Sequence, residues 1–506
     1  MLKQLPIGKQ TFRDVIEENN LYIDKTKFAL ELIQSHKYLF LSRPRRFGKS
    51  LFLDTLKNIF EGNKTLFQGL YIYDRYNWAE QYPVIKIGFG GVRSSDELKQ
   101  SIMAILRENR LKLKITAELQ SDDYALCLRE LIQLVYNQYQ QKVVVLIDEY
   151  DKPILDNLDQ LAVAKENREI LKRFYTEIKV NDEYLKFAFL TGVSKFSKVS
   201  IFSGLNNLTD ISLQEKYGNI CGYTQHDIET SFLPYLADVD LKKLQLWYNG
   251  YNFLGDKVYN PFDILLFIDG NRRFKNYWFE TGTPEFLINL IKDQNYYIPA
   301  LENLEVDESL INSFDIENIS LETVLFQTGY LTIKQIANDD NFLSYTLGFP
   351  NKEVRSAFNN YLFNLFINKT QKNSIRTELL QLFKHAELNN LEPIIKRLFA
   401  NIAYNNFTNN SIANYEGFYA SVLYSCFASL GLELIAEDVT NQGRIDLTLK
   451  IADKSYIFEF KVTAEQPLQQ IKARKYYEKY RGDIFIIGIN FDKAAKNISS
   501  FKWEQV

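Results

Sequence analysis

A short run, Gly48-Lys49-Ser50, contains the first residues whose types and order could do chemistry. Backbone N–H groups at a helix start hold phosphates, and a lysine and a hydroxyl beside them can bind phosphate and Mg²⁺. Lys49 would reach the β- and γ-phosphates of a nucleotide, and Ser50 would hold the metal. The longer phosphate-loop pattern G-x-x-x-x-G-K-[ST] requires a glycine where this chain has Arg43. Alone, the tripeptide is also compatible with a helix start that carries an exposed lysine.

A second group, two carboxylates, follows the apolar run VVVLI at 143–147. Such a run is typical of a central parallel strand that is buried on both faces. Ligands of open α/β sheets bind at the carboxyl ends of such strands. Asp148 would then hold Mg²⁺ through water, and Glu149 would polarise the attacking water. The alternative is a solvated acidic turn, because Tyr150 and Asp151 continue the polar stretch.

Strand-like runs alternate with helical patterns in the N-terminal part of the chain. The strands are expected at 21–26, 38–41, 83–89, 143–147, 185–192 and 208–213, and the helices at 51–60, 95–139 and 160–179. This alternation predicts an α/β fold, with a parallel sheet and helices on both faces. Thr191 ends one of these strands and could sense a γ-phosphate, with an ordinary strand exit as the alternative.

Two acidic residues and a lysine near the C-terminus could form another site. Asp446 lies in a predicted strand at 443–449, and Glu459 and Lys461 lie in the next, at 455–462. Side chains alternate along a strand, so Glu459 and Lys461 share a face, and the hairpin can bring Asp446 beside Glu459. The two carboxylates could then share Mg²⁺ or Mn²⁺ next to a lysine that orients water. Alternating charges on an exposed face are the alternative, but the strand around Glu459 is otherwise apolar, where unpaired charge is costly.

A basic stretch rich in tyrosine follows at 470–481, before a further apolar strand at 483–490. Such a stretch could contact phosphates and stack on bases. Its candidate contact residues are Gln470, Lys472, Arg474, Lys475 and Arg481. The alternative is a solvated face of an amphipathic helix.

The middle of the chain is expected to be mainly helical. Thr224 and Asp227 have the spacing of a helix cap with an acid at the third position. Strands at 331–336 and 342–347 flank the polar turn 338–340, which predicts a β-hairpin. The polar stretch 405–410 is the best linker candidate. We therefore expect domains at 1–223, 224–404 and 405–506.

Composition excludes several classes of protein. The 506 residues carry a net charge of −3, so a uniformly basic nucleic-acid binder is excluded and any basic surface must be local. Three cysteines and three histidines are scattered, which favours neither a disulfide framework nor a zinc site. We find no apolar run of membrane-spanning length and no signal-peptide pattern, so we expect a cytoplasmic protein without a membrane partner.

Several stretches, in order, resemble a bacterial architecture that joins an AAA-ATPase-like domain to a PD-(D/E)XK nuclease-superfamily domain. They are YIDKT, SRPRRFGKS, VVVLIDEYD, FLTGVSKFS, WYNGYNF, YNPFDIL, LFQTGYLTI, LGFPNKEVR, YEGFYASVLY, GRIDLTL and FEFKV. The resemblance implies a P-loop sheet, a helical middle with a hairpin, and a restriction-endonuclease-like C-terminal domain. It also implies that Arg45 and Arg46 belong to the phosphate loop. Glu416, Asp446, Glu459 and Lys461 match the nuclease core, and Gln470 matches with them.

Together, the motifs and the resemblance predict an ATP-binding and ATP-hydrolysing protein whose C-terminal domain cleaves nucleic acid with Mg²⁺ (or Mn²⁺). Asp446 and Glu459 would hold the metal, Glu416 would assist the metal shell, and Lys461 would act on the water. DNA is the expected nucleic acid, and a homo-oligomer is an open alternative to a monomer. The alternative function is a nucleotide-switched sensor whose nuclease-like domain binds nucleic acid without cutting it.

Overall fold

The computed structural model describes residues 2–196, 201–278, 287, 291, 297–312, 314–339, 342–367, 369–402, 416–440, 443–462 and 465–506. The chain forms two compact units, one of residues 1–277 with 306–345 and one of residues 278–305 with 346–506. The predicted linker at 405–410, and with it the predicted domain boundary after 404, lies outside the described residues. The predicted boundary after 223 falls inside a short strand, β6 (Tyr223–Thr224). The three-domain division stays a proposal.

The first unit contains a five-stranded parallel sheet with the order β2-β3-β4-β1-β5. Its strands are β1 (Tyr38–Ser42), β2 (Val84–Gly88), β3 (Val143–Asp148), β4 (Leu185–Gly192) and β5 (Thr209–Asp210). The predicted parallel sheet is confirmed. From β1 the chain crosses to β2 at the far edge, whereas from β4 it crosses to β5 on the other side of β1. Between such neighbours the connections diverge and leave a crevice at the carboxyl ends.

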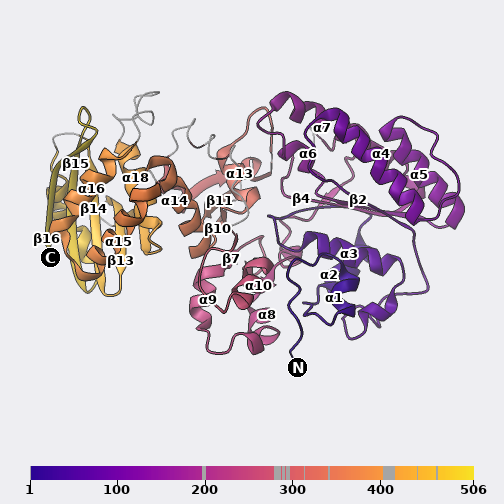
Figure 1. Cartoon of the computed structure of the whole chain (residues 1–506), viewed down its shortest axis with the longest axis horizontal. Coiled ribbons are helices and arrows are strands. Elements are labelled where there is room, and N and C mark those ends of the chain that lie inside the picture. The colour runs from indigo at the N-terminus through magenta and orange to yellow at the C-terminus, as the bar shows by residue number, and fades with distance from the viewer. Residues whose placement is uncertain are drawn as a thin grey trace. The chain divides into compact units, whose positions relative to one another are not determined.

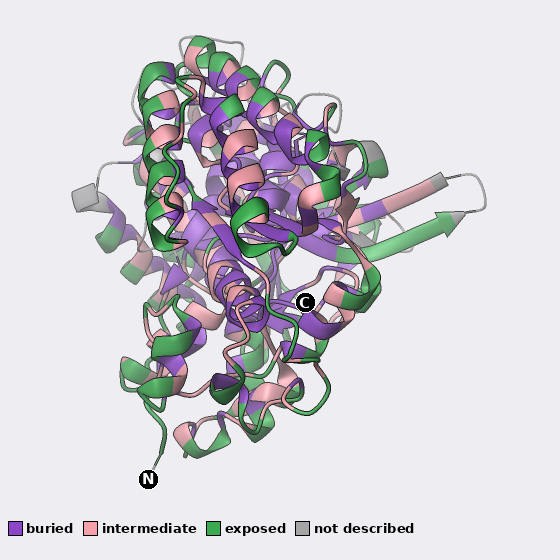
Figure 2. Ribbon diagram, turned by 90° about the vertical axis from the view of Figure 1, so that its right-hand side faces the viewer, coloured by how far each residue is buried: buried purple, intermediate pink, exposed green. Residues whose placement is uncertain are grey.

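Helices cover both faces of this sheet, with α1 to α3 on one side and α4 to α7 on the other (Figure 1). They are α1 (Phe12–Glu17), α2 (Thr26–Ser35), α3 (Lys49–Phe60), α4 (Ser95–Lys112), α5 (Tyr124–Tyr139), α6 (Lys152–Leu155) and α7 (Leu161–Val180). Figure 2 shows buried strands between helices whose outer faces are exposed. The helical stretch predicted at 95–139 is interrupted, because Asp123 accepts N–H bonds from Ala125 and Leu126 and starts α5 anew.

The strand predicted at 21–26 is wrong. Residues 21–25 form no strand, and Thr26 begins α2. Asp24 Oδ1 accepts the Thr26 N–H at 2.8 Å and the Thr26 hydroxyl at 2.7 Å. This local side-chain bond competes with strand pairing and favours a helix start.

The remainder of the first unit carries smaller elements. They are α8 (Gln225–Thr230), α9 (Leu241–Tyr248), β7 (Asn249–Tyr251), β8 (Val258–Tyr259), α10 (Pro261–Asp269), α12 (Glu308–Asn312) and α13 (Leu321–Thr328). The predicted cap at Thr224 and Asp227 is confirmed as a reciprocal capping box. Strands β10 (Thr332–Asp339) and β11 (Phe342–Gly348) are neighbours in a sheet of order β10-β11-β9, with β9 at Leu304–Asp307. This agrees with the predicted hairpin.

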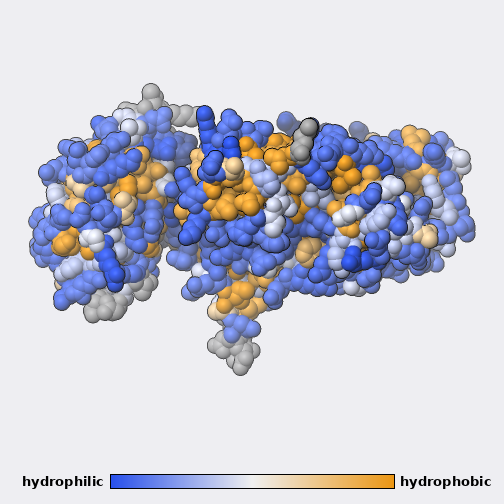
Figure 3. Space-filling model, turned by 90° about the horizontal axis from the view of Figure 1, so that it is seen from below, coloured by the Kyte–Doolittle hydropathy of each residue, from blue (hydrophilic) through white to orange (hydrophobic). Residues whose placement is uncertain are grey.

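The second unit contains a five-stranded mixed sheet of order β12-β13-β14-β15-β16. Its elements are α14 (Lys352–Phe366), α15 (Lys369–His385), α16 (Leu391–Ala400), α18 (Glu416–Ala428), β12 (Glu433–Thr440), β13 (Gly443–Ile451), β14 (Lys454–Lys461), α19 (Pro467–Ala473), β15 (Asp483–Asp492) and β16 (Asn497–Gln505). Strands β14 and β15 are parallel, and the other neighbouring pairs are antiparallel. Hydrophilic side chains cover much of the face seen in Figure 3, with apolar patches between them.

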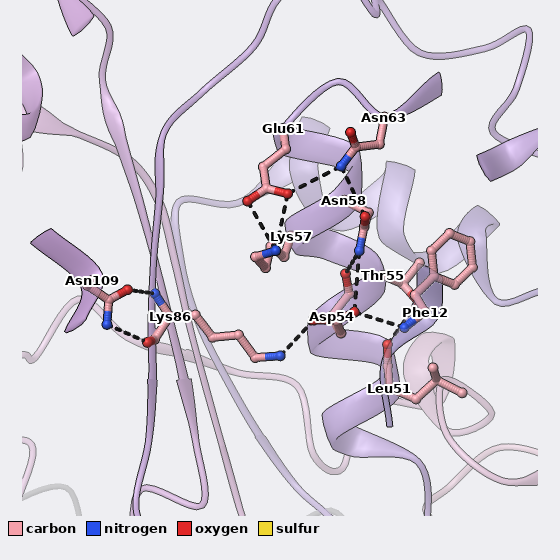
Figure 4. A network of polar contacts seen from close by, with 10 residues as sticks. All are labelled: Phe12, Leu51, Asp54, Thr55, Lys57, Asn58, Glu61, Asn63, Lys86 and Asn109. Carbon is pink, nitrogen blue, oxygen red and sulfur yellow. Dashed lines mark hydrogen bonds and ion pairs between the residues drawn. The ribbon is translucent and has the colours of Figure 1, made fainter. Parts of the chain in front are cut away.

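A polar network centred on Asp54 ties α3 to the N-terminal segment and to the edge strand β2 (Figure 4). The nearly buried Asp54 carboxylate accepts the Phe12 N–H at 2.8 Å and pairs with Lys86 Nζ at 2.7 Å. On the other side of Lys86, Asn109 binds both its backbone N–H and its carbonyl oxygen. Because β2 is the sheet edge, these bonds satisfy backbone groups that would otherwise lack partners.

We predict that Asp54→Ala lowers the free energy of unfolding by about 2–3 kcal/mol, because it leaves the Phe12 N–H and Lys86 without their partner. The loss is below that of a fully buried pair because the Lys86 side chain is 33% exposed. Urea-induced unfolding measures the difference. The control is Lys57→Ala on the same helix, whose pair with Glu61 is more exposed and should cost less than about 1 kcal/mol. Equal losses in the two variants would contradict the role of Asp54.

Candidate nucleotide and metal sites

The predicted phosphate loop connects β1 to α3 at the carboxyl edge of the parallel sheet. Gly48 has φ +91°, a backbone conformation that favours glycine, and α3 begins at the next residue. Lys49 is buried, and its Nζ donates to the carbonyl oxygens of Arg43 at 2.8 Å and Pro44 at 3.0 Å. The sequence thus forms the strand, loop and helix that an anion site requires.

Arg43 occupies the position of the missing glycine and anchors the loop. Its buried guanidinium donates to the carbonyl oxygens of Ser212 at 2.7 Å and Tyr217 at 3.1 Å. It also lies 4.0 Å from the centre of the Phe253 ring. Burial lowers the pKa of Arg43 to about 10, so the group stays charged at neutral pH. A side chain therefore fixes the loop by contacts that glycine could not make.

Asp148 and Thr191 meet beside this loop. Leu41 pairs with Thr191, and Ile147 pairs with Leu190, so β1, β3 and β4 end at one level. The Thr191 hydroxyl is buried and donates to Asp148 Oδ1 at 2.7 Å. Glu149 follows with φ +52° and pairs with Lys152 Nζ at 3.0 Å. Such a backbone conformation is uncommon for glutamate and occurs at functional turns.

The solvated acidic turn is contradicted at Tyr150 and Asp151, although Glu149 before them is partly exposed. Both residues are buried, and Asp151 Oδ2 accepts the N–H groups of Val193 at 3.0 Å and Ser194 at 2.6 Å. Burial raises the pKa of Asp151 to about 6, and these bonds and Lys49 oppose the rise. The polar run DEYD was the only sequence signal for Asp151. A Cβ at Gly192 would lie 2.7 Å from Asp151 Oδ1, so this approach requires glycine.

The electrostatics of Lys49 connect these groups. Burial lowers the pKa of its ammonium, and Asp148, Asp151 and Glu149 oppose that shift. Lys49 and Asp151 are both buried, and in such surroundings electrostatic interactions are stronger than in water, whereas Glu149 acts from a partly exposed position.

The other predicted loop residues are placed differently. Arg45 is exposed, with its guanidinium 3.9 Å from Asp156 Oδ1. Arg46 has φ +68°, and its guanidinium lies over the Phe262 ring at 3.9 Å on α10. Ser50 lies in the first turn of α3 and is partly exposed. In this structure Arg46 contacts α10, whereas Arg45 stays at the surface.

The C-terminal residues of the second candidate site come together as the hairpin predicted. In the register of β13 and β14 the last pair is Leu447 with Phe458, so Asp446 and Glu459 occupy the next opposed positions. Asp446 Oδ2 accepts the Phe460 N–H at 2.7 Å. Lys461 Nζ lies 3.3 Å from Glu459 Oε1. One hairpin thus places two carboxylates and an ammonium on one face of the sheet.

Residues of two helices, α18 and α19, also reach this group. Glu416, at the start of α18, lies with Oε1 3.5 Å from Lys461 Nζ. Gln470, on α19, donates its amide N–H to Glu459 Oε1. The predicted match of both residues to this centre agrees with these contacts. Gln470 therefore belongs to the carboxylate site rather than to the outer surface.

Desolvation dominates the electrostatics of this group. Burial raises the pKa of Glu459, and the neighbouring Asp446 raises it further. Burial also raises the pKa of Asp446. For Lys461, burial acts to lower the pKa, but the carboxylates of Asp446, Glu459 and Glu416 outweigh it and raise the pKa. The positive charge of Lys461 therefore does not fully compensate the two buried carboxyl groups of Asp446 and Glu459.

Two observations bear on a metal. Glu459 is 1% exposed, and within the described part of the chain its Oε2 atom has no hydrogen-bond partner. A buried carboxylate oxygen without a partner fits a hard cation. Among the described residues, however, no three His, Cys, Asp or Glu side chains form a group that could hold a metal. Glu416 thus does not join Asp446 and Glu459 in a ready-made set, and the residues present fit a cation such as Mg²⁺ that keeps several waters.

Sequence reasoning missed three residues beside this centre, Glu437, Arg444 and Tyr297. Glu437 lies on β12 with φ +53°, pairs with Arg444, and accepts the Tyr297 hydroxyl. Its carboxylate contributes to the raised pKa of Asp446. Arg444 precedes Asp446 by two positions, so both side chains share a face. That spacing was the available signal for Arg444, whereas Tyr297 lies 140 positions from Glu437 and had none.

The basic stretch is not one helix. Helix α19 ends at Ala473, and Lys475 has φ +48°. Lys472 pairs with Glu504, Arg474 donates to the Tyr476 hydroxyl, and Lys475 pairs with Glu478. Arg481 is exposed and has no partner among the described residues. The predicted stacking surface is wrong at Tyr476, which is buried in a hydrophobic core with Ile445 and Ile471, whereas Tyr477 and Tyr480 pack against that core and are partly buried. Apolar burial of the rings outweighs their exposure for base contact.

Comparison with known proteins places these sites in context. Residues 6–202 match the family model described as predicted AAA-ATPase, and residues 414–501 match the PD-(D/E)XK nuclease superfamily. An Azotobacter chroococcum mcd 1 protein, named "Uncharacterized protein in vnfD 5'region", is 44% identical over 100% of this chain and 99% of its own length. No helix in the described ranges has the length and apolarity to cross a membrane. The chain belongs to the family that joins a predicted AAA-ATPase-like domain to a C-terminal domain of the PD-(D/E)XK nuclease superfamily.

Proposed function

We propose that this protein is a nucleic-acid nuclease whose N-terminal domain binds and hydrolyses ATP. The observation that carries the nuclease proposal is the buried Glu459, one oxygen of which has no hydrogen-bond partner among the described residues and which lies in one cluster with Asp446 and Lys461. Such a cluster lowers the stability of the fold, because two carboxylates of like charge are removed from water side by side. The match to the PD-(D/E)XK superfamily supports the same proposal.

In this proposal each residue of the C-terminal site has one role. A bound Mg²⁺ (or Mn²⁺) polarises the phosphate and favours a hydroxide nucleophile. Asp446 and Glu459 hold that ion, while Gln470 orients Glu459. Lys461 holds the attacking water and neutralises charge that develops on the phosphate oxygens. Glu416 keeps the Lys461 ammonium in place through their contact.

At the N-terminal site the loop and the sheet edge would hold ATP. Lys49 binds the β- and γ-phosphates, and Ser50 and Asp148 hold the accompanying Mg²⁺. Glu149 orients the attacking water. Thr191 keeps Asp148 in position through its hydroxyl bond. Arg45 and Arg46 are further candidate phosphate contacts of the loop.

We propose DNA as the substrate. The surface residues proposed to contact its phosphates are Lys472, Arg474, Lys475 and Arg481. Their local partners are mostly exposed, so exchange for phosphate costs little.

The second candidate function is a nucleotide-switched sensor that binds nucleic acid without cutting it. The observation that favours it is the lack of a three-carboxylate metal group among the described residues. The two functions differ in one result, the Mg²⁺-dependent degradation of DNA by the purified protein.

For the nucleotide site, we predict that Lys49→Ala weakens ATP binding about tenfold or more, since each lost charge-assisted hydrogen bond is worth about 1.5–3 kcal/mol. Isothermal titration measures the affinity. Lys57→Ala, which removes a partly exposed lysine on the same helix, is the matched control and should bind as the wild type. Equal affinity in the two variants would refute the role of Lys49. Glu149→Gln should keep ATP affinity and lose hydrolysis.

For the metal site, we predict that Asp446→Ala and Glu459→Ala each abolish cleavage together with metal binding, because one carboxylate holds Mg²⁺ poorly against water. Lys461→Ala should keep metal binding and slow cleavage about a hundredfold. The measurements are a DNA cleavage time course at several Mg²⁺ concentrations and Mn²⁺ titration by calorimetry. Lys454→Ala, at the opposite end of β14, is the control. Wild-type cleavage by Glu459→Ala would refute the assignment.

A further inference from the structure

A groove of about 270 Å³ lies on the C-terminal sheet beside the carboxylate site. It is bordered by residues 465–469 at the start of α19 and by the strands β15 and β16. Its polar lining includes Gln469, Asn490, Ser500 and Lys502. None of these residues belongs to the proposed catalytic set.

The strand register places this groove on the same face as the catalytic residues. Lys461 on β14 pairs with Asn490 on β15, which pairs with Ser500 on β16. In the neighbouring row, Glu459 pairs with Gly488, and Gly488 pairs with Lys502. Opposed residues share a face, and neighbouring strands lie about 4.8 Å apart, so Ser500 lies on the order of 10 Å from Lys461. This distance is within reach of one flexible nucleotide strand.

Gly488 explains how the groove and the site lie so close to α19. A Cβ at this position would lie 2.5 Å from the Leu468 N atom, so only glycine allows the start of α19 to pack on β15. The helix therefore lies directly on the sheet between the Glu459 side and the Lys502 side. The close packing of α19 on β15 thus forms one side of the groove.

Several side chains that line the groove have no protein partner among the residues that the structure describes. Within the described residues the side chains of Lys502, Ser499, Ser500 and Gln469 make no hydrogen bond or ion pair. By contrast, the nearby Lys472 is paired with Glu504 at 2.6 Å. One carboxylate, Glu465, also borders the groove, and its carbonyl oxygen accepts the Asn490 amide N–H at 2.7 Å.

We propose that this groove binds one nucleotide of the substrate strand, next to the phosphate that is cleaved at Asp446 and Glu459. The inference rests on the proposed nuclease function and specifies its substrate. The Lys502 ammonium binds the backbone phosphate, and the hydroxyl and amide groups bind sugar and base edges. The volume is near the lower end of ligand pockets, about 300 Å³, and suits a single nucleotide.

The substrate class follows from this geometry. A base that is stacked and paired in a duplex enters such a groove only after it is unstacked, which costs a few kcal/mol. Single strands and frayed strand ends carry bases that are already free. The groove therefore selects single-stranded nucleic acid or strand ends over continuous duplex.

The test uses the full-length protein and a labelled single-stranded oligonucleotide, DNA in one arm and RNA in the other. Fluorescence anisotropy without divalent metal measures affinity over a range of salt concentrations, and cleavage with Mg²⁺ is measured in parallel. The variants are Lys502→Ala and Ser500→Phe, which fills the groove. Lys493→Ala is the matched control, since Lys493 is an exposed lysine between β15 and β16 and does not line the groove.

We expect Lys502→Ala to weaken single-strand binding and to reduce the salt slope by about 0.7, the value for one phosphate contact on a single strand. Ser500→Phe should weaken single-strand binding and leave duplex binding unchanged. Lys493→Ala should keep the wild-type slope. A larger effect in the DNA or RNA arm identifies the nucleic acid.

The outcomes separate this inference from the proposed nuclease function. Wild-type binding by both groove variants overturns the inference, and if the wild-type protein also cuts DNA, the nuclease function stands without it. Loss of binding in both variants, with no cleavage by the wild-type protein, supports the groove as a nucleotide site and overturns the nuclease function. A wild-type protein that binds neither oligonucleotide overturns both.

Discussion

Both candidate sites depend on charge that is buried at the carboxyl end of apolar strands. Lys49 is 6% exposed and Glu459 is 1% exposed, and each is surrounded by groups of which several are also charged. A charge taken out of water is tolerated only where partners compensate for the lost hydration. The loop carbonyls serve Lys49, whereas Gln470 and Lys461 serve one oxygen of Glu459. The surrounding helices and strand registers hold those partners in place.

The two sites meet this constraint in different ways. At the N-terminal site Lys49 donates its hydrogen bonds to carbonyl oxygens of its own loop. Arg43 anchors that loop by donating to the carbonyl oxygens of Ser212 and Tyr217. At the C-terminal site the compensation is incomplete, because one Glu459 oxygen has no partner within the described residues. An incomplete buried network is a poor structural feature and a suitable cation site. Because of this contrast, the proposed function rests mainly on the C-terminal metal site and less on the ATP site.

The groove beside the C-terminal site extends the same reasoning to the substrate. Gly488 lets α19 lie close against β15, and the side chains of Lys502, Ser500 and Gln469 beyond it have no partner in the part of the chain that the structure describes. Unpaired polar groups on a solvated face cost little by themselves. Their position in register with Glu459 and Lys461 gives them a functional meaning, because a strand held at the metal passes within reach of them.

The sequence by itself determined the main strands of both sheets and the parts of each site that depend on local pattern. Apolar runs predicted the strands β1 to β4, and the hairpin spacing predicted that Asp446 faces Glu459, because residue alternation and a short turn set that register. Only the tertiary structure decided the role of Arg43, the burial of Asp151, the contact of Tyr297 with Glu437, and the packing of Tyr476 into a core rather than onto a base. The physical reason is that these outcomes depend on contacts between residues far apart in the chain, such as Tyr297 and Glu437, and on which side chains lose water when separate elements pack.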